Sequence, residues 1–155
     1  MPSSYHKAVQ KAIVSFGGGF RKIKKIRESG RPLHITHPTK KKIILYNPDV
    51  RFELKNRKII IFEIIDSQPE DKTIADITRS LLAKNVTQLY FIVKSEDMRD
   101  KIADIYDIIL SGFADYFEGE KKKLFTGGNN ILVIAEDIVM DEMKLQELIS
   151  NNISI

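Results

Sequence analysis

The sequence predicts an α/β domain in which a mixed central β-sheet is flanked by helices. Two patterns predict this class: a β-hairpin pattern in residues 47–66, and an alternation of helix and strand patterns after it. The length of 155 residues suits one domain, and no repeat, low-complexity tract or linker divides the chain. We therefore expect residues 1–155 to form a single domain with a basic N-terminal third.

The N-terminal region is expected to begin with two helical segments. Residues 4–16 follow an N-cap serine and carry an apolar stripe, and a run of three glycines ends this helix. Residues 20–29 are expected to resume the helix, because Phe20, Ile23 and Ile26 lie at helical spacing. Short strands are expected on either side of a basic turn, at residues 33–36 and 42–46.

The hairpin pattern follows these short strands. Residues 49–54 alternate polar and apolar, residues 55–57 form a polar break, and residues 58–65 are almost continuously β-branched. Alternation, a short polar loop and a second β-rich run are typical of two antiparallel strands joined by a tight turn.

A turn centred on Asn56 sets the register of this hairpin. Leu54 then lies opposite Lys58, and Asp49 lies opposite Glu63. Directly opposed residues hold their Cβ atoms about 4.5–5.5 Å apart, where like charges repel. A divalent cation such as Mg²⁺, which takes oxygen ligands from carboxylates, would turn this repulsion into a binding site. A register shifted by one or two residues would instead leave both carboxylates solvated.

Beyond the hairpin, helix and strand patterns alternate to the end of the chain. Apolar residues at helical spacing predict helices at residues 72–84, 98–116 and 140–149. Apolar, strand-forming segments lie between them at residues 88–94 and 130–135. A hairpin followed by this alternation is the reason for expecting a mixed sheet with helices against it.

The net charge of +4 conceals a strong asymmetry. Residues 1–48 contain 11 Lys or Arg and one acidic residue, whereas residues 49–155 contain 14 basic and 20 acidic residues. A segregated basic region favours a polyanionic partner, because Lys and Arg contacts to phosphates supply most sequence-independent affinity for nucleic acid. The candidate nucleic-acid-binding residues are Arg21, Lys22, Lys24, Lys25, Arg27, Lys40, Lys41 and Lys42. The alternative is a solvated basic face.

Composition also bounds the environment of the protein. The absence of cysteine excludes disulfides, thiolate metal sites and a cysteine nucleophile. No apolar run reaches the roughly 18 residues of a membrane span, and the N-terminus lacks the apolar core of a signal peptide. We therefore expect a cytoplasmic protein without a membrane partner. Twenty-four isoleucines, abundant Lys and Glu, and no Trp or Cys favour a thermophilic source.

The order of these elements and their acidic residues resembles the PD-(D/E)XK nuclease superfamily, which includes restriction endonucleases and archaeal Holliday junction resolvases. The resemblance rests on Pro48-Asp49, a gap of 13 residues, and Glu63 within an apolar strand, and it extends over residues 5–110. It implies a restriction-endonuclease-like fold and hydrolysis of DNA phosphodiesters. It also implies that Asp49 and Glu63 ligate Mg²⁺ or Mn²⁺, with the carbonyl of Ile64 as a further ligand.

The chain departs from the superfamily pattern at the catalytic lysine. That lysine falls on the second residue after the acidic one, and here this position is Ile65. Lys72, at the start of the next helix, is the candidate replacement, and Arg51 shares the face of Asp49 and could contact phosphate. Lys58 lies about 16 Å from Glu63 along the strand and is discounted.

Other polar residues are weaker candidates. The superfamily often places an acidic residue in the first helix, where this chain offers His6 and Gln10. Asp66 is expected on the face opposite Glu63, as a cap for the loop into the next helix. Glu53 shares the face of Asp49 but lies about 13 Å farther along the strand.

Three functions remain open from the sequence. The first is a metal-dependent nuclease acting on DNA. The second is a catalytically degenerate nuclease-fold protein that binds nucleic acid or mediates assembly, which the isoleucine at position 65 favours. The third is an α/β interaction domain whose basic face binds a protein. Apolar C-terminal residues could support a homodimer or could cover the sheet; these are Leu145, Leu148, Ile149, Ile153 and Ile155.

Overall fold

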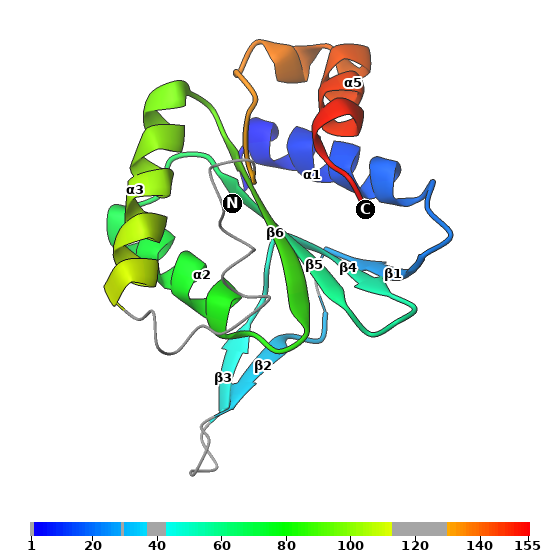
Figure 1. Cartoon of the computed structure of the whole chain (residues 1–155). Coiled ribbons are helices and arrows are strands. Elements are labelled where there is room, and N and C mark those ends of the chain that lie inside the picture. Colours follow the sequence, from blue (N-terminus) through cyan, green and yellow to red (C-terminus); the bar gives the residue numbers. More distant parts are fainter. Residues whose placement is uncertain (1, 29, 37–42, 113–129) are drawn as a thin grey trace.

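The computed structural model of the chain describes residues 2–28, 30–36, 43–112 and 130–155. The N-terminal elements are α1 (Ser4–Gly17), β1 (Ile23–Arg27), β2 (Leu33–Thr36), β3 (Ile43–Tyr46), β4 (Val50–Leu54) and β5 (Ile59–Ile65). The elements that follow are α2 (Glu70–Leu82), β6 (Val86–Val93), α3 (Glu96–Gly112), β7 (Ile131–Val133), the short 3₁₀ helix η2 (Ile138–Met140) and α5 (Glu142–Asn152). The predicted α/β class is therefore confirmed (Figure 1).

A five-stranded mixed sheet forms the centre of the fold, in the order β1-β4-β5-β6-β7. β4 runs antiparallel to both β1 and β5, whereas β5, β6 and β7 run parallel to one another. The parallel half requires crossovers, which α2 and α3 provide. β2 and β3 form a separate two-stranded sheet. It projects away from the body of the molecule (Figure 1).

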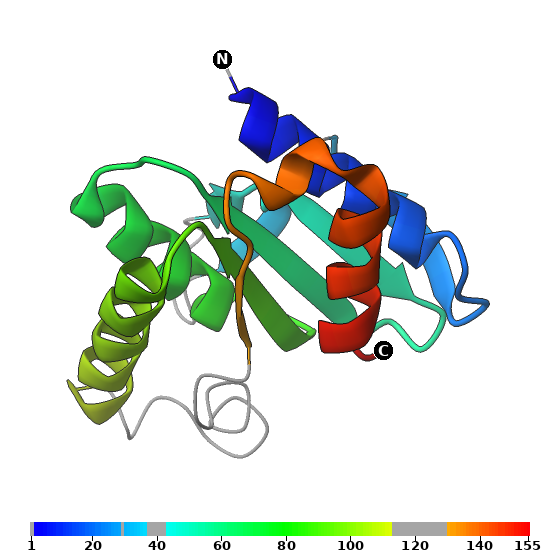
Figure 2. The same cartoon turned by 90° about the horizontal axis from the view of Figure 1, so that it is seen from above.

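The two faces of the central sheet bury separate apolar clusters. α2 and α3 cover one face, and α1 and α5 cover the other (Figure 2). β5 is buried along its whole length, because Ile61 and Ile65 enter the first cluster while Ile60 and Ile64 enter the second. This explains why its sequence is a continuous apolar run instead of an alternating one. Its one charged residue is Glu63.

The helix expected at residues 20–29 is wrong, because β1 occupies this segment. A register irregularity between Ile23 and Lys25 places an extra residue in β1 relative to β4. Ile23 pairs with Leu54 and Ile26 pairs with Phe52, so both isoleucines lie on one face although they are three residues apart. A bulged strand therefore reproduces the spacing that predicted a helix.

The apolar C-terminal residues cover the sheet. Leu145, Ile149 and Ile153 are 3%, 0% and 4% exposed and pack in the cluster that contains α1. They are therefore part of the core of this chain. Within the described ranges no helix is both long and apolar enough to cross a membrane.

Gly17 is expected to be intolerant of any side chain. It is buried at the end of α1, and a Cβ atom there would lie 2.6 Å from Cζ of Phe52 and 2.9 Å from Cδ1 of Ile26. We expect Gly17→Ala to reduce the free energy of unfolding by about 1–3 kcal/mol through overpacking, measured by chemical denaturation. Gly18→Ala is the matched control, because its nearest neighbour is a backbone oxygen at 3.5 Å. Equal stabilities for the two variants would contradict this account.

Candidate functional site

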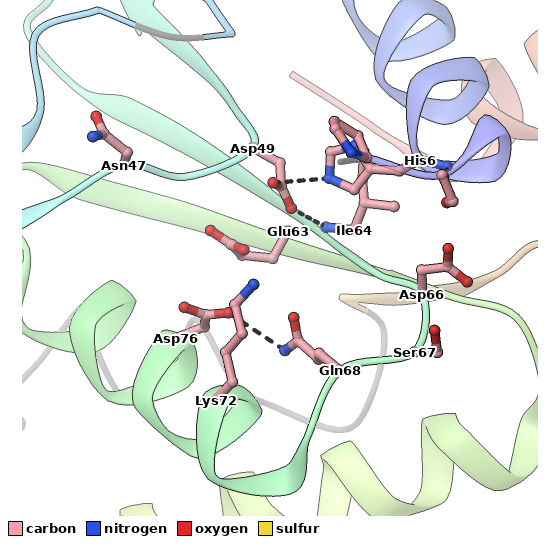
Figure 3. A pocket seen from close by; sticks show the side chains of 12 residues that line it. His6, Asn47, Asp49, Glu63, Ile64, Asp66, Ser67, Gln68, Lys72 and Asp76 are labelled. Atoms are coloured by element: carbon pink, nitrogen blue, oxygen red, sulfur yellow. Dashed lines mark hydrogen bonds and ion pairs between the residues drawn. The ribbon is translucent and has the colours of Figure 1, made fainter.

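A cavity of about 510 Å³ lies between the N-terminus of α1, the end of β5 and the start of α2 (Figure 3). It gathers titratable side chains from four parts of the chain. Its charged and titratable lining residues are His6, Asp49, Glu63, Asp66, Lys72 and Asp76. Three of these, Asp49, Glu63 and Lys72, are the catalytic residues that the sequence predicts.

The hairpin register brings Asp49 and Glu63 together. Val50 pairs with Phe62, so extending the register by one residue places Asp49 opposite Glu63. At the turn, the Leu54 amide donates to the Lys58 carbonyl at 2.9 Å. The register predicted from the turn at Asn56 is therefore confirmed.

The carboxylate of Asp49 is held by donors from α1 and β5. His6 Nε2 lies 2.9 Å from Oδ1, and the Ile64 amide donates to Oδ2 at 2.8 Å. Gln10, one turn further along α1, donates from Nε2 to the Asp49 carbonyl at 2.9 Å. Both α1 positions that the superfamily resemblance singled out therefore contact Asp49, one at its side chain and one at its backbone.

Glu63 is a buried carboxylate in an acidic environment. Its side chain is 5% exposed, and Tyr46 Oη donates to Oε1 at 2.6 Å. Burial raises the pKa of Glu63 well above its usual range, and the neighbouring Asp49 and Asp76 raise it further. The hydrogen bond from Tyr46 opposes this shift. Ionised Glu63 is therefore costly unless a cation enters the cavity.

Asp76 is a site residue that the sequence prediction missed. It lies on α2, is 8% exposed, and has Gln68 Nε2 3.4 Å from Oδ2. Burial raises its pKa, while Gln68, Lys72 and Arg79 lower it and Asp49 raises it. The available signal was a carboxylate one residue before Ile77, on the apolar side of the α2 pattern. Tyr46 gave no such signal, because an aromatic residue in a short strand is ordinary core.

Lys72 lines the cavity, whereas Ile65, at the position of the superfamily's catalytic lysine, does not. The Lys72 side chain extends from α2 toward the carboxylates of the hairpin (Figure 3). Ile65 is 3% exposed and packs in the apolar cluster beneath α2 and α3. Residue 65 is therefore part of the apolar core, and the positively charged group at the cavity is the Lys72 ammonium group on α2.

Asp66 lines the far end of the same cavity. β5 ends at Ile65, so strand alternation no longer directs the Asp66 side chain away. Asp66 pairs with Lys94, and hydrogen bonds from Lys94 and Ser3 lower its pKa against the effect of burial. The expected capping role is wrong, since the N-cap of α2 is Pro69 and no side-chain capping hydrogen bond is formed there.

The predicted nucleic-acid-binding residues lie outside this cavity. Arg21, Lys22, Lys24 and Lys25 are exposed around β1. Arg27 Nε lies 2.5 Å from Glu53 Oε2, and Arg51 is 5% exposed with its Nε 3.9 Å from the same oxygen. Arg51 is therefore turned toward Glu53 and away from solvent. Lys40, Lys41 and Lys42 lie outside the described residues.

The donor set suits a hard cation better than a soft one. Asp49 and Glu63 supply carboxylate oxygens in an open cavity, as Mg²⁺ and Mn²⁺ prefer. Among the described residues, no group of three or more histidine, aspartate or glutamate side chains is arranged to hold a metal ion. A cation here would therefore be bound by two carboxylates, completed by backbone or solvent oxygens.

Comparisons with known proteins identify no relative. No family model, no curated protein and no solved structure matches this chain significantly.

Proposed function

We propose that the protein is a metal-dependent nuclease that hydrolyses DNA phosphodiesters, with a restriction-endonuclease-like fold of the PD-(D/E)XK type. The observation that carries this proposal is the opposition of Asp49 and Glu63 in a cavity that Lys72 also lines. The element order supports it, because α1, the antiparallel strands β4 and β5, α2 and the parallel strand β6 occur in the order of that superfamily, with β1, β2 and β3 between α1 and β4.

Each side chain at the cavity would have a distinct role in this reaction. Asp49 and Glu63 would hold Mg²⁺ or Mn²⁺, which when bound polarises a phosphate oxygen and lowers the pKa of a coordinated water. Lys72 supplies a positive charge from α2 beside the developing negative charge of the phosphate. His6 and Tyr46 orient the two carboxylates through their hydrogen bonds. Pre-orientation of this kind reduces the reorganisation needed during the reaction.

A non-catalytic nucleic-acid-binding protein with the same fold is the second candidate. The buried Ile65 favours it, because the position of the superfamily's catalytic lysine lies in the apolar core, where a lysine would disrupt the packing. The burial of a carboxyl group at Glu63 supports the nuclease, since an uncharged residue of the same shape would be more stable there in a protein that binds no cation.

Incubation with supercoiled plasmid and branched DNA tests the proposal. We expect cleavage with Mg²⁺ or Mn²⁺ at millimolar concentration, none with EDTA, and none for Asp49→Asn in a folded protein. Asp104→Asn, which changes an exposed aspartate on α3, is the matched control and should cleave normally. DNA binding without cleavage under any of these conditions would favour the second candidate. Cleavage that survives Asp49→Asn would reject this site.

A further inference from the structure

A group of unpaired cations gathers at the end of the hairpin opposite the cavity. Residues 21–25 and 55–58 contain seven Lys or Arg and no acidic residue. We call them the basic edge: Arg21, Lys22, Lys24, Lys25, Lys55, Arg57 and Lys58. All seven are exposed, and none forms an ion pair with a described residue.

The basic edge is one surface although it comes from two segments. The Lys55 amide donates to the Lys22 carbonyl at 3.0 Å, and Ile23 pairs with Leu54. The α1–β1 connection and the β4–β5 turn lie side by side at the end of the sheet (Figure 1). Elsewhere, the exposed lysines Lys11 and Lys101 pair with Glu142 and Glu70, whereas no cation of the basic edge has such a partner among the described residues.

The backbone of the turn points to a role for its charge. Arg57 has φ 70°, a left-handed conformation that glycine adopts freely and a branched or long side chain does not. A three-residue hairpin loop usually places glycine at this position. The Arg57 amide donates to the Leu54 carbonyl at 3.0 Å, so the turn is well formed despite this residue. An arginine at a position whose backbone favours glycine suggests a function for its side chain.

The distance between the basic edge and the cavity sets where each would contact a duplex. Lys58 is five residues from Glu63 along β5, and Lys55 is six residues from Asp49 along β4, which corresponds to roughly 16–20 Å. Lys25 pairs with Glu53, so it lies on the face of the sheet that carries the two carboxylates. A rise of 3.4 Å per base pair converts this distance to about five or six base pairs.

We propose that the basic edge binds the phosphate backbone of duplex DNA about five or six base pairs from the phosphate held at Asp49 and Glu63. The inference rests on the proposed nuclease function for the position of the cut, and on the charge and exposure of the basic edge for the binding itself. Phosphate contacts of this kind position the duplex without reading its sequence.

Binding is measured by fluorescence anisotropy with a 20-base-pair duplex in EDTA, where no cleavage occurs. The quadruple variant K24Q/K25Q/K55Q/K58Q is expected to bind at least tenfold more weakly at low salt. Its slope of log affinity against log salt should be shallower by about 0.9 for each phosphate that no longer has a lysine beside it. The matched control K11Q/K84Q/K101Q/K144Q removes the same charge from exposed lysines elsewhere and should bind within threefold of wild type.

A single substitution separates charge from folding. Arg57→Gly is expected to keep or raise the thermal unfolding midpoint, because it removes a left-handed arginine, while still weakening DNA binding. Equal reductions of affinity in the two quadruple variants would overturn the inference, as would no binding by wild type or tighter binding to single-stranded RNA of equal length.

Cleavage assays keep this inference distinct from the proposed function. If K24Q/K25Q/K55Q/K58Q, the basic-edge variant, cleaves DNA as fast as wild type does, the inference about the basic edge is rejected and the proposed nuclease function is kept. Basic-edge-dependent binding without cleavage would support the basic edge and reject the nuclease. If both hold, duplexes with fewer than about five base pairs on one side of the cut should be cleaved no faster by wild type than by the variant. Rapid wild-type cleavage of such short duplexes would overturn the spacing.

Discussion

Replacing Glu63 with glutamine is expected to abolish cleavage and to make the metal-free protein more stable. The two effects have one cause, the burial of this carboxylate beside Asp49 and Asp76. Glutamine preserves the shape of the side chain and still accepts the hydrogen bond from Tyr46. Its amide can donate to a neighbouring carboxylate, so no buried polar group is left unpaired. The free energy of unfolding at neutral pH should therefore rise by about 1–3 kcal/mol.

The pH dependence of stability gives the sign of this effect. The pKa of Glu63 is raised in the folded state, so the folded protein binds its proton more tightly than the unfolded chain does. The contribution of Glu63 to stability is then fully present below its unfolded pKa, near 4.3, and is lost as pH rises through the folded value. Wild type should lose stability over that range. The Glu63→Gln variant should lose less, with the remaining slope due to Asp76, whose pKa is also raised.

Denaturation in EDTA and in Mg²⁺ separates these contributions. Mg²⁺ or Mn²⁺ should raise the unfolding midpoint of wild type, because a ligand that binds only the folded state stabilises it. The same ions should leave Glu63→Gln unchanged. Glu147→Gln, on the exposed side of α5, is the matched control and should behave as wild type. A Glu63→Gln protein that is less stable than wild type in EDTA would contradict the conclusion that the buried Glu63 carboxyl group lowers the stability of the metal-free protein.

The carboxylate pair could be predicted from sequence because the hairpin is a local structure. Alternation before the turn, the polar loop at Asn56 and the β-branched run after it determine which residues oppose each other. No distant contact is needed to place Asp49 opposite Glu63. The prediction failed at β1. In a regular strand Ile23 and Ile26 would lie on opposite faces, so their spacing of three residues indicated a helix. Bulges have no reliable sequence signature, so this segment could not be assigned correctly.

The surroundings of the pair depend on tertiary contacts and were only partly predictable. His6 meets Asp49 because α1 packs against the sheet 43 residues earlier in the chain. Tyr46 is the last residue of β3 and hydrogen-bonds Glu63 on β5, a contact between the two sheets. Lys72 was identified from its place at the start of the following helix. Asp76, one turn further, was not, because burial of a helical carboxylate depends on what the helix packs against.

Replacing Lys72 with methionine is expected to reduce kcat by about 10²–10³-fold while leaving KM within a few-fold of wild type. Losses of this size follow removal of one group that stabilises charge in the transition state. The side chain is exposed at the cavity and lies on α2, so methionine should not disturb the fold. A loss confined to kcat would place Lys72 at the reacting phosphate, because an effect on KM alone would indicate ground-state binding.

Two companion variants test whether both the position and the charge of this side chain are required. Lys72→Arg keeps the charge in a bulkier group and should recover part of the lost activity. Adding Ile65→Lys to Lys72→Met should recover none and should destabilise the protein, because Ile65 is 3% exposed within the apolar cluster beneath α2 and α3. Lys84→Met, just beyond α2, controls for the loss of a lysine. Full activity in Lys72→Met, measured by initial rates on the same substrate, would remove Lys72 from the catalytic residues and leave the carboxylates to act without a neighbouring cationic side chain.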